Sequence, residues 1–428
     1  MTTQTSTAET QRSRRALVAG SVGNFVEWYE FGAYGFFATV IAANFFSPDG
    51  SGDAESLIRT YASFALAFFF RPIGAALFGR IGDRIGRRPT LILVLLLMTG
   101  ATTLIGLLPT YAAIGAAAPW ILTGVRALQG LSAGGEFGGA VSIMTEFAPR
   151  GRRGLYGSWQ SFTVALGLLA GAGLAAVLGS VLSAEALNDW GWRVPFLLAL
   201  PLGLVALWLR LRLPETPHFE RATTQVASPP GRETVKAIAL GISRLMGWSA
   251  AGYTFLVVLP SYLQSSLNAT FQQALIATVL ANLGFALTII PAGWFSDRVG
   301  RKPVMVTGSV LIVVLAIPLL NLLQDKEVGN GVKGVAVLLA GAVVGLLAGP
   351  GPAMLSEMFP TTVRYTGLGL AYSLSNAVFS GSAGLIIIEL IKRTGNLDIP
   401  AYYVLVTSLV SVVGLLTLRN EHAEELRD

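Results

Sequence analysis

The sequence predicts an all-α membrane protein in which twelve spanning helices form two pseudo-symmetric six-helix halves. Hydrophobic residues make up 53% of the chain and charged residues only 13%, and the mean hydropathy is +0.62. Ordinary soluble proteins carry about 25% charged residues. Apolar stretches of roughly 20 residues, the length that a helix needs to cross a bilayer, recur along the whole chain. A charged segment also occurs twice, at equivalent places in the two halves.

Short polar segments separate the apolar stretches and delimit the predicted spans. We place these spans at 16–43, 57–79, 90–108, 118–144, 155–181, 193–211, 237–263, 271–294, 304–323, 333–356, 366–390 and 400–419. The only long hydrophilic stretch inside the chain lies near its middle and divides six spans from six. The predicted organisation is therefore an N-terminal arm (1–15), an N-terminal six-helix bundle (16–211), a central loop (212–236), a C-terminal six-helix bundle (237–419) and a tail (420–428).

The duplicated segment reads RIGDRIGRRPTLI at 80–92 and WFSDRVGRKPVMV at 294–306, and a second echo aligns TEFAPRGRRG at 145–154 with SEMFPTTVRY at 356–365. Parallel repeats of this kind predict a substrate site at the interface of two halves, which rock to expose it alternately on each side. Each copy of the first segment lies on a turn between two helices, where an Asp and several Arg can form a clasp that breaks when that side opens. We therefore predict a gating role for Asp83, Arg84, Arg87, Asp297, Arg298 and Arg301.

The distribution of Lys and Arg predicts the orientation, because these residues accumulate in cytoplasmic loops. With the N-terminus inside, only six of the 30 basic residues fall in outside segments, namely Arg59, Arg193, Lys326, Lys333, Lys392 and Arg393. The first span is too long for the apolar region of a cleaved signal peptide and lacks a cleavage site. We expect a protein of the bacterial cytoplasmic (inner) membrane, with both termini in the cytoplasm, that contacts the lipid bilayer and acts as a monomer.

Ionisable residues inside the spans are few and indicate function, because each costs roughly 2.5 to 3.5 kcal/mol to insert and normally faces a cavity or a partner. Most of them lie in the N-terminal half, which suggests that this half handles protons and charge. They are Glu27, Glu30, Arg71, Arg126, Glu136, Arg244 and Glu389.

The first span carries a polar stripe, because residues three or four apart share one face of a helix. Gly23, Glu27, Glu30 and Tyr34 form this stripe, and Asn24 lies at its edge. Buried carboxylates that titrate concentrate at functional sites, so we assign proton coupling to the two glutamates and substrate contacts to the other polar side chains. The alternative is that one glutamate only pairs with an arginine and holds two helices together.

Two arginines are candidates for binding a substrate carboxylate through two parallel hydrogen bonds. Arg126 lies about 12 Å from the start of its span at 1.5 Å per residue, which is too deep for a loop anchor. Arg71 lies closer to a loop, and its side chain can instead extend to the membrane surface. Glu136, among glycines, is assigned to proton coupling or to a structural hydrogen bond between helices.

The C-terminal half supplies fewer candidates. Tyr253 is an aromatic residue that can shape the cavity or belong to an interfacial belt. Asn376 can donate a hydrogen bond to the substrate or form one with a neighbouring helix. The stretch Gly-Pro-Gly-Pro at 349–352 predicts a break in the tenth span, at a place where backbone lines a cavity.

Residue types exclude several other functions. The chain has no Cys and only two His, both outside the predicted spans, so we expect no metal site, no cofactor and no enzymatic nucleophile paired with a base. The basic residues are scattered over many segments, so we expect no nucleic-acid partner.

Several motifs resemble one transporter family. GRIGDRIGRR at 79–88 is similar to the signature loop of the major facilitator superfamily, and RALQGLSAG at 126–134 resembles its Arg-xxx-Gly-xxx-Gly motif, which is linked there with proton coupling. The segments GNFVEWYEFGAYGF (23–36), QGLSAGGEFGGA (129–140) and DWGWRVPF (189–196) resemble the metabolite:proton symporter branch. The segment at 357–384 is most similar to α-ketoglutarate permeases. Many members carry Asp where this chain has Glu30.

The resemblance implies the major facilitator fold and a secondary active transporter that moves its substrate by alternating access. We expect proton-coupled uptake of a small organic anion, most simply a dicarboxylate such as 2-oxoglutarate, with the substrate and protons as the only partners besides lipid. The alternative is a proton symporter of a zwitterionic compatible solute such as proline or betaine, or of a monocarboxylate, citrate or a shikimate-type acid.

Overall fold

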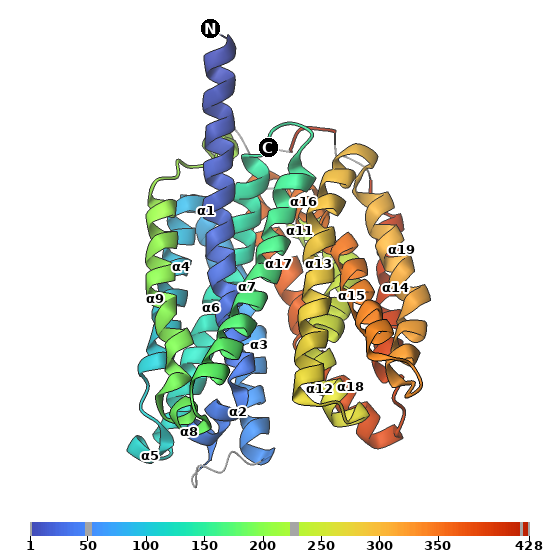
Figure 1. The fold of residues 1–428 in the computed structure, drawn as a ribbon. Helices are drawn as coiled ribbons and strands as arrows, with labels where there is room; N and C mark the ends of the chain where they lie inside the picture. The colour runs from blue at the N-terminus through green and yellow to red at the C-terminus, as the bar shows by residue number, and fades with distance from the viewer. Residues whose placement is uncertain (1, 48–53, 223–230, 420–422, 427–428) are drawn as a thin grey trace.

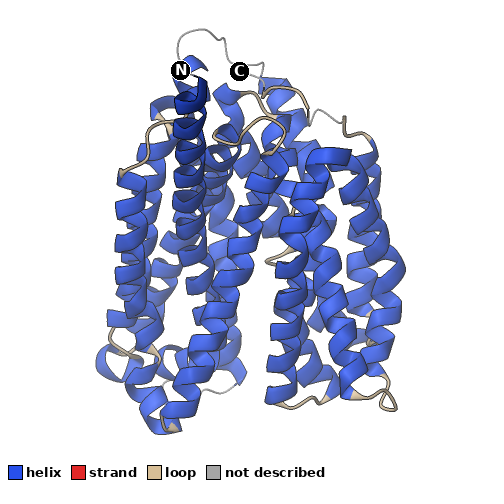
Figure 2. Cartoon of the chain, turned by 45° about the horizontal axis from the view of Figure 1, so that its top comes forward, coloured by secondary structure: helices blue, strands red, loops and turns tan. Residues whose placement is uncertain are grey.

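The computed structural model describes residues 2–47, 54–222, 231–419 and 423–426, and the described residues are helical with short connections and no strand (Figure 2). Both chain ends lie on one face of the molecule, which we call the terminal face (Figure 1). The all-α architecture with twelve membrane-spanning segments in two halves agrees with the fold that the sequence predicts.

The first half contains six long helices, which occupy the positions of the first six predicted spans. The first begins well before residue 16, so the predicted N-terminal arm continues the first span as one helix. The long helices are α1 (Thr2–Phe36), α3 (Ala54–Ile85), α4 (Arg87–Leu107), α6 (Ala117–Glu146), α7 (Arg153–Val181) and α9 (Arg193–Leu211). Short pieces extend or connect them: α2 (Ala38–Ile41), η1 (Ala42–Phe46), α5 (Tyr111–Ile114), α8 (Ala184–Ala186) and η2 (Leu187–Gly191).

The second half repeats this arrangement after the short helix α10 (Pro217–Ala222) in the central loop. Its seventh span begins at Gly231, six residues earlier than predicted. The uninterrupted long helices are α13 (Phe271–Val299), α14 (Arg301–Gln324) and α19 (Ile399–Leu416). The other spans are built of α11 (Gly231–Tyr253), η3 (Thr254–Val258) and α12 (Leu259–Leu267), of α15 (Asn330–Ala348) and α16 (Gly351–Met358), and of η4 (Thr361–Val363), α17 (Arg364–Phe379) and α18 (Ala383–Thr394).

Three of the spans in the second half are thus interrupted. The predicted break in the tenth span lies between α15 and α16. The eleventh span breaks between α17 and α18, where the sequence Ser-Gly-Ser at 380–382 interrupts the regular helix. The seventh span passes through a π-helical segment, a feature that often marks functional sites. The last two breaks were not predicted from the sequence.

Ten helical segments of the described part of the chain are long and apolar enough to cross a membrane. The helices α1 and α6 are not among those ten, yet they complete the set of twelve, and they carry most of the buried charged residues of the first half. Large apolar side chains cover the outer surface of the bundle, for example Trp120, Val181 and Val413, each at least 67% exposed. Such a surface is suited to lipid contact.

Glycines allow the close approach of equivalent helix pairs in the two halves. A Cβ atom on Gly130 of α6 would lie 2.1 Å from the carbonyl oxygen of Ala67 on α3. In the second half, a Cβ atom on Gly341 of α15 would lie 1.9 Å from the carbonyl oxygen of Ala281 on α13. The glycines of the Arg-xxx-Gly-xxx-Gly motif therefore have a packing role, because only a residue without a side chain fits there.

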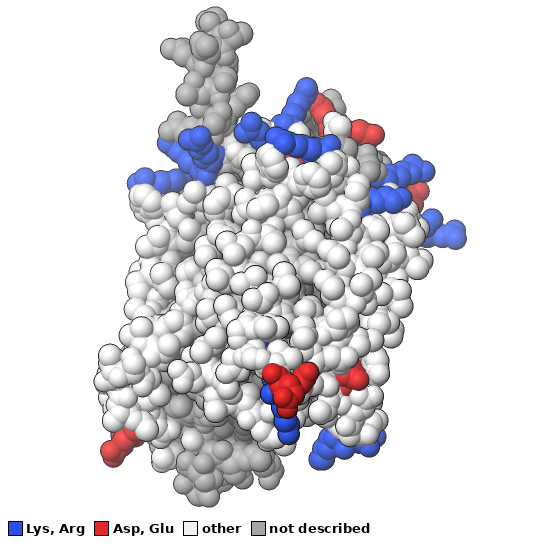
Figure 3. Space-filling view, turned by 45° about the vertical axis from the view of Figure 1, so that its right-hand side comes forward, with Lys and Arg blue, Asp and Glu red and all other residues white. Residues whose placement is uncertain are grey.

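The two halves pack against each other through α3 with α17 and α7 with α13. The crossing is tight near the terminal face, where a Cβ atom on Gly79 would lie 2.6 Å from the Cα atom of Thr366. Lys and Arg side chains gather near this face, and the broad middle band of the visible surface is almost free of charge (Figure 3).

Candidate functional site

A small cavity of about 40 Å³ lies between the halves and is bordered by α1, α7, α11, η3, α13 and α17. None of its lining residues is charged. Aromatic rings form much of the wall, and a few neutral polar groups accompany them. The aromatic residues are Trp28, Trp248, Tyr253, Phe285 and Tyr372, and the polar ones are Ser161, Ser249 and Asn376. Two of the predicted substrate contacts, Tyr253 and Asn376, are therefore wall residues of one cavity.

A buried ion pair lies beside this cavity. Glu27 on α1 and Arg71 on α3 are each 2% exposed, and 3.1 Å separates the carboxylate oxygen from Nη2 of the guanidinium. The guanidinium also lies 4.5 Å from the ring centre of Phe31 and 4.6 Å from that of Phe68. Because both members are deeply buried, removing either one would leave an uncompensated charge, which typically costs about 3 to 5 kcal/mol.

A second arrangement links Glu30 to Arg126 through two neutral side chains. The Arg126 guanidinium donates to Gln129 over 2.6 Å, the Gln129 amide donates to Thr102 over 2.6 Å, and the Thr102 hydroxyl donates to Glu30. Arg126 also lies 4.1 Å from the ring centre of Tyr34. Among the described residues, the other Glu30 oxygen and two nitrogens of Arg126 have no hydrogen-bond partner. A chain of hydrogen bonds through Gln129 and Thr102 thus connects the carboxylate and the guanidinium, which do not contact each other directly.

Glu136 lies apart from these groups and pairs with Arg210 of α9. Arg210 also donates to the carbonyl oxygen of Leu91 over 2.7 Å. A Cβ atom on Gly23 would collide with Arg210 and Glu136, so this glycine makes room for the pair. The arrangement fits the structural role that the sequence left open for Glu136, since it joins α6 to α9.

Other predicted residues take different positions. The Asn24 amide donates to the Gln160 carbonyl oxygen and to Thr163 on α7, so its hydrogen bonds are used between helices rather than in the cavity. The Tyr34 hydroxyl shares a hydrogen bond of 2.7 Å with Ser63. Both side chains are buried away from the cavity lining, and the structure does not group them with Tyr253 and Asn376.

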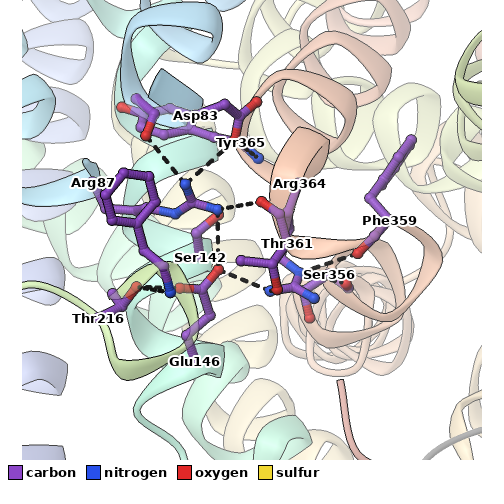
Figure 4. A network of polar contacts seen from close by, with 12 residues as sticks. Asp83, Arg87, Ser142, Glu146, Thr216, Ser356, Phe359, Thr361, Arg364 and Tyr365 are labelled. Carbon is purple, nitrogen blue, oxygen red and sulfur yellow. Dashed lines mark hydrogen bonds and ion pairs between the residues drawn. The ribbon is translucent and has the colours of Figure 1, made fainter. Parts of the chain in front are cut away.

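The terminal face is closed by a cluster that we call the first clasp, formed by Asp83, Arg87, Glu146 and Arg364 (Figure 4). Asp83 accepts hydrogen bonds from the backbone nitrogens of Tyr365 and Thr366, at the start of α17 in the other half. Glu146 is 2.9 Å from Arg364 and 3.4 Å from Arg87. A carboxylate at a helix N-terminus is favourable because the unpaired backbone N–H groups point at it.

A second clasp repeats this geometry with the roles of the halves exchanged, and consists of Asp297, Arg301, Glu357 and Arg153. Asp297 accepts hydrogen bonds of 2.7 and 2.8 Å from the backbone nitrogens of Gly154 and Leu155, at the start of α7. Glu357 is 3.0 Å from Arg301 and 3.3 Å from Arg153. The two clasps are thus equivalent under the internal symmetry.

The turn inside each duplicated segment needs a glycine, because Gly86 and Gly300 have φ angles of 112° and 95°. Four of the six predicted gating residues belong to the clasps. The other two, Arg84 and Arg298, are exposed, and Arg298 lies over the ring of Trp294 at 3.7 Å. The helix turn directs these two side chains away from the facing half, and the structure does not bring them to the clasps.

Several site residues were not assigned a role from the sequence. Glu146, Glu357, Arg153 and Arg364 were recognised only as aligned positions of the repeat, although polar residues aligned between two halves were a usable signal. The sequence pattern did not single out Thr102, Gln129 or Arg210. Their hydrogen bonds and ion pair depend on which helices are neighbours in the fold. Arg244 is buried and donates to Gly414 on α19 and to Thr417 directly after it, whereas Glu389 is exposed and pairs with Arg393. No group of three potential metal-ligating side chains occurs in the described ranges.

Two family models match the chain. One, for sugar (and other) transporters, matches residues 16–228, and one, for the major facilitator superfamily, matches residues 237–428. A solved structure with a similar fold is a proton:xylose symporter bound to 6-bromo-6-deoxy-D-glucose, with a TM-score of 0.83 at 17% identity over 98% of both chains. The inward open conformation of the Escherichia coli xylose transporter gives a TM-score of 0.65 at 18% identity, over 92% of this chain and 94% of that chain.

Several similar proteins are named as transporters of proline, betaine or ectoine. A glycine betaine/proline/ectoine/pipecolic acid transporter of Dickeya dadantii is 34% identical over 95% of this chain and 82% of its own length. An ectoine/proline transporter of Corynebacterium glutamicum is 33% identical over 97% and 86%. A proline/betaine transporter of Escherichia coli is 33% identical over 94% and 82%. The substrates in these names agree with the alternative expectation from the sequence, a zwitterionic compatible solute. They do not support the predicted likeness to α-ketoglutarate permeases.

Proposed function

Because the chain belongs to the major facilitator superfamily, we propose that it is a proton-coupled symporter for the uptake of a zwitterionic compatible solute such as betaine or proline. The relatives are named for this class of substrate. A zwitterion thus replaces the dicarboxylate that the sequence analysis preferred as the substrate.

The uncharged aromatic wall of the cavity is the observation that carries this proposal. The rings of Trp28, Trp248 and Tyr253 present faces that attract a quaternary or secondary ammonium group. The Arg71 guanidinium lies 5.3 Å from the ring centre of Trp28, so a cation lies close by for the substrate carboxylate. A zwitterion brings no net charge into the cavity, whereas burying an unpaired second carboxylate would be costly.

We propose that Glu30 carries a proton in the transport cycle, with Arg126, Gln129 and Thr102 setting its surroundings. Glu30 has one oxygen without a partner among the described residues, which leaves room for a proton or a water. Glu30→Gln should permit exchange of labelled for unlabelled substrate and abolish accumulation driven by a pH gradient. Undiminished accumulation in this variant would reject the role of Glu30.

A dicarboxylate such as 2-oxoglutarate is the second candidate. One observation favours it: Arg71 and Arg126 each have two guanidinium nitrogens without a hydrogen bond among the described residues. The central guanidinium carbons of both lie within 5.0 Å of the ring centre of Phe31. A dianion that reached both arginines would be paired at each end. Arg126→Ala should then abolish its binding, whereas a zwitterion held at Arg71 should still bind.

We propose that the terminal face is cytoplasmic, because the basic residues gather there (Figure 3). The chain would then be a monomeric protein of the bacterial inner membrane with both termini inside. Both clasps must open when the cavity is exposed to the cytoplasm.

Uptake into proteoliposomes with an imposed inward proton gradient tests the proposed function. Labelled betaine and labelled 2-oxoglutarate should be compared, each in competition with proline, ectoine and a series of mono-, di- and tricarboxylates. We expect gradient-driven accumulation of betaine that proline and ectoine reduce. Accumulation of 2-oxoglutarate without that of betaine would replace the zwitterion with the dicarboxylate.

A further inference from the structure

We propose that Arg71 holds the carboxylate of the substrate, and that this carboxylate takes the place of Glu27, which is released from the ion pair and binds a proton. The inference rests on the proposed function and adds a coupling step to it. It makes Glu27 the counter-ion of the empty carrier and a proton carrier of the loaded one.

The position of the ion pair supports this exchange. Glu27 directly precedes Trp28, a wall residue of the cavity, and the Arg71 guanidinium lies over the Trp28 ring. The ring of the wall residue Tyr253 packs against that of Phe68, with 5.3 Å between the ring centres, and the Arg71 guanidinium lies 4.6 Å from the ring centre of Phe68. A substrate whose ammonium group lies among these rings therefore has its carboxylate near Arg71.

The pair is also poorly aligned for an arginine and a carboxylate. Such partners commonly form two parallel hydrogen bonds. Here Nη2 of Arg71 lies 3.1 Å from Glu27, but Nε and Nη2 make no aligned hydrogen bond in the described structure. The rings of Phe31 and Phe68 contact the guanidinium through its charge and do not use its Nε and Nη2 hydrogen-bond donors. A second carboxylate can therefore form hydrogen bonds that Glu27 does not form.

The loss of its partner favours a proton on Glu27. In the empty carrier the pair is neutral. When the substrate carboxylate joins Arg71, an ionised Glu27 would lose its counter-ion in an apolar site, which is unfavourable. A proton from solution that binds the released Glu27 removes this buried charge, and the substrate ammonium group is held by the aromatic rings. The proton on Glu27 then moves with the substrate and is additional to the proton that Glu30 carries.

Several titratable or charged groups surround Glu27, so each must be considered in its pH dependence. Glu136 and Arg210 form their own pair, and the two tyrosines belong to the cavity wall. The groups are Glu30 on α1, Arg71 on α3, Glu136 on α6, Arg210 on α9, Tyr253 on α11 and Tyr372 on α17. Only Arg71 among them is within ion-pair distance of Glu27.

Proton uptake on substrate binding is the decisive measurement. The purified full-length chain in weakly buffered detergent solution, with a pH indicator, should take up about one proton per bound betaine. Choline, which has the same cation without the carboxylate, should cause no uptake. Betaine binding without proton uptake, or equal uptake with choline, would overturn the exchange.

Variants of Glu27 identify the group that binds the proton. In the unmodified chain, betaine affinity should rise about tenfold per unit decrease in pH over the range where the free Glu27 is ionised. Glu27→Gln should abolish this slope and the proton uptake while binding betaine at least as tightly. Glu27→Asp should restore the slope. Glu389→Gln, at an exposed carboxylate, should behave like the unmodified chain.

The outcomes separate this inference from the proposed function. If betaine binds and Glu27→Gln keeps the pH slope, the exchange at Arg71 is rejected and the symporter proposal stands. If 2-oxoglutarate binds in place of betaine, the proposed substrate is rejected. A proton uptake with 2-oxoglutarate that Glu27→Gln removes would still support the exchange.

Discussion

At the scale of single residues, Thr102 connects the two charged members of the proposed coupling site. Its hydroxyl donates to Glu30 and accepts from Gln129, which in turn accepts from Arg126. Thr102→Val keeps the shape of the side chain and leaves two buried polar groups without their shared partner. We expect accumulation in proteoliposomes to fall at least tenfold while substrate exchange persists, with a loss of about 1 to 3 kcal/mol in stability.

The adjacent Thr103 provides a matched control. Its hydroxyl donates to the Thr99 carbonyl oxygen over 2.8 Å, one turn back on the same helix, and the side chain is half-buried. Thr103→Val should therefore leave accumulation close to that of the unmodified chain. An equal defect in the two variants would show that α4 tolerates neither change, and that Thr102 has no special part in coupling.

At the scale of elements, the glycines of α6 determine how closely it approaches α3. A methyl group on Gly130 would meet the backbone of Ala67 at 2.1 Å, and this contact cannot be relieved by moving a side chain. We expect Gly130→Ala to lower the thermal unfolding temperature of the purified protein clearly, as overpacking typically costs about 1 to 3 kcal/mol. The shift can be read from the loss of monodisperse protein on heating in detergent.

Gly124 on the same helix is the matched control, because a Cβ atom there has no neighbour within 4 Å. Gly124→Ala should keep the unfolding temperature or raise it, since alanine favours a helix interior by up to about 1 kcal/mol over glycine. Equal destabilisation by both substitutions would contradict the packing role of Gly130.

The sequence predicted the elements themselves well, because length and apolar composition decide which segments span a bilayer. It predicted the break at Gly349 and Pro350 from residue type. It did not predict the break between α17 and α18 or the π-helical segment η3, because their residues are compatible with regular helix. At the break, the Phe379 carbonyl oxygen accepts a hydrogen bond from Tyr403, and Gly381 lies close to Phe68 of the other half.

At the scale of the whole molecule, internal repetition predicted both the two halves and the location of the clasps. Asp83 and Asp297 could be found because the repeat preserves them. Glu27, Arg71 and Arg126 could be found because charge is rare in a membrane. The partners of these residues could not be found, since Glu136 faces Arg210 and Asn24 faces α7 only as a result of helix packing. The substrate class also depended on wall residues from several helices.

The equivalence of the two clasps leads to a prediction about the transport cycle. Each clasp joins a carboxylate of one half to the first turn of a helix in the other. Asp83→Ala or Asp297→Ala should each remove one of these connections and shift the carrier toward a state that is open at the terminal face. The first clasp is the more deeply buried, so Asp83→Ala should have the larger effect.

Cysteine labelling can measure this shift directly, because the chain has no Cys of its own. A cysteine at Ser249, a wall residue of the cavity, reports access from either side. In membrane vesicles that expose the terminal face, a membrane-impermeant thiol reagent should label Ser249→Cys several-fold faster when Asp83→Ala or Asp297→Ala is added. Asp325→Ala, at an exposed residue after α14, serves as the control and should leave the rate unchanged. Because opening one face closes the other in alternating access, labelling from the opposite face should slow in the same variants. Faster labelling from both faces would instead indicate general loosening of the bundle and contradict a role of the clasps in selecting the open side.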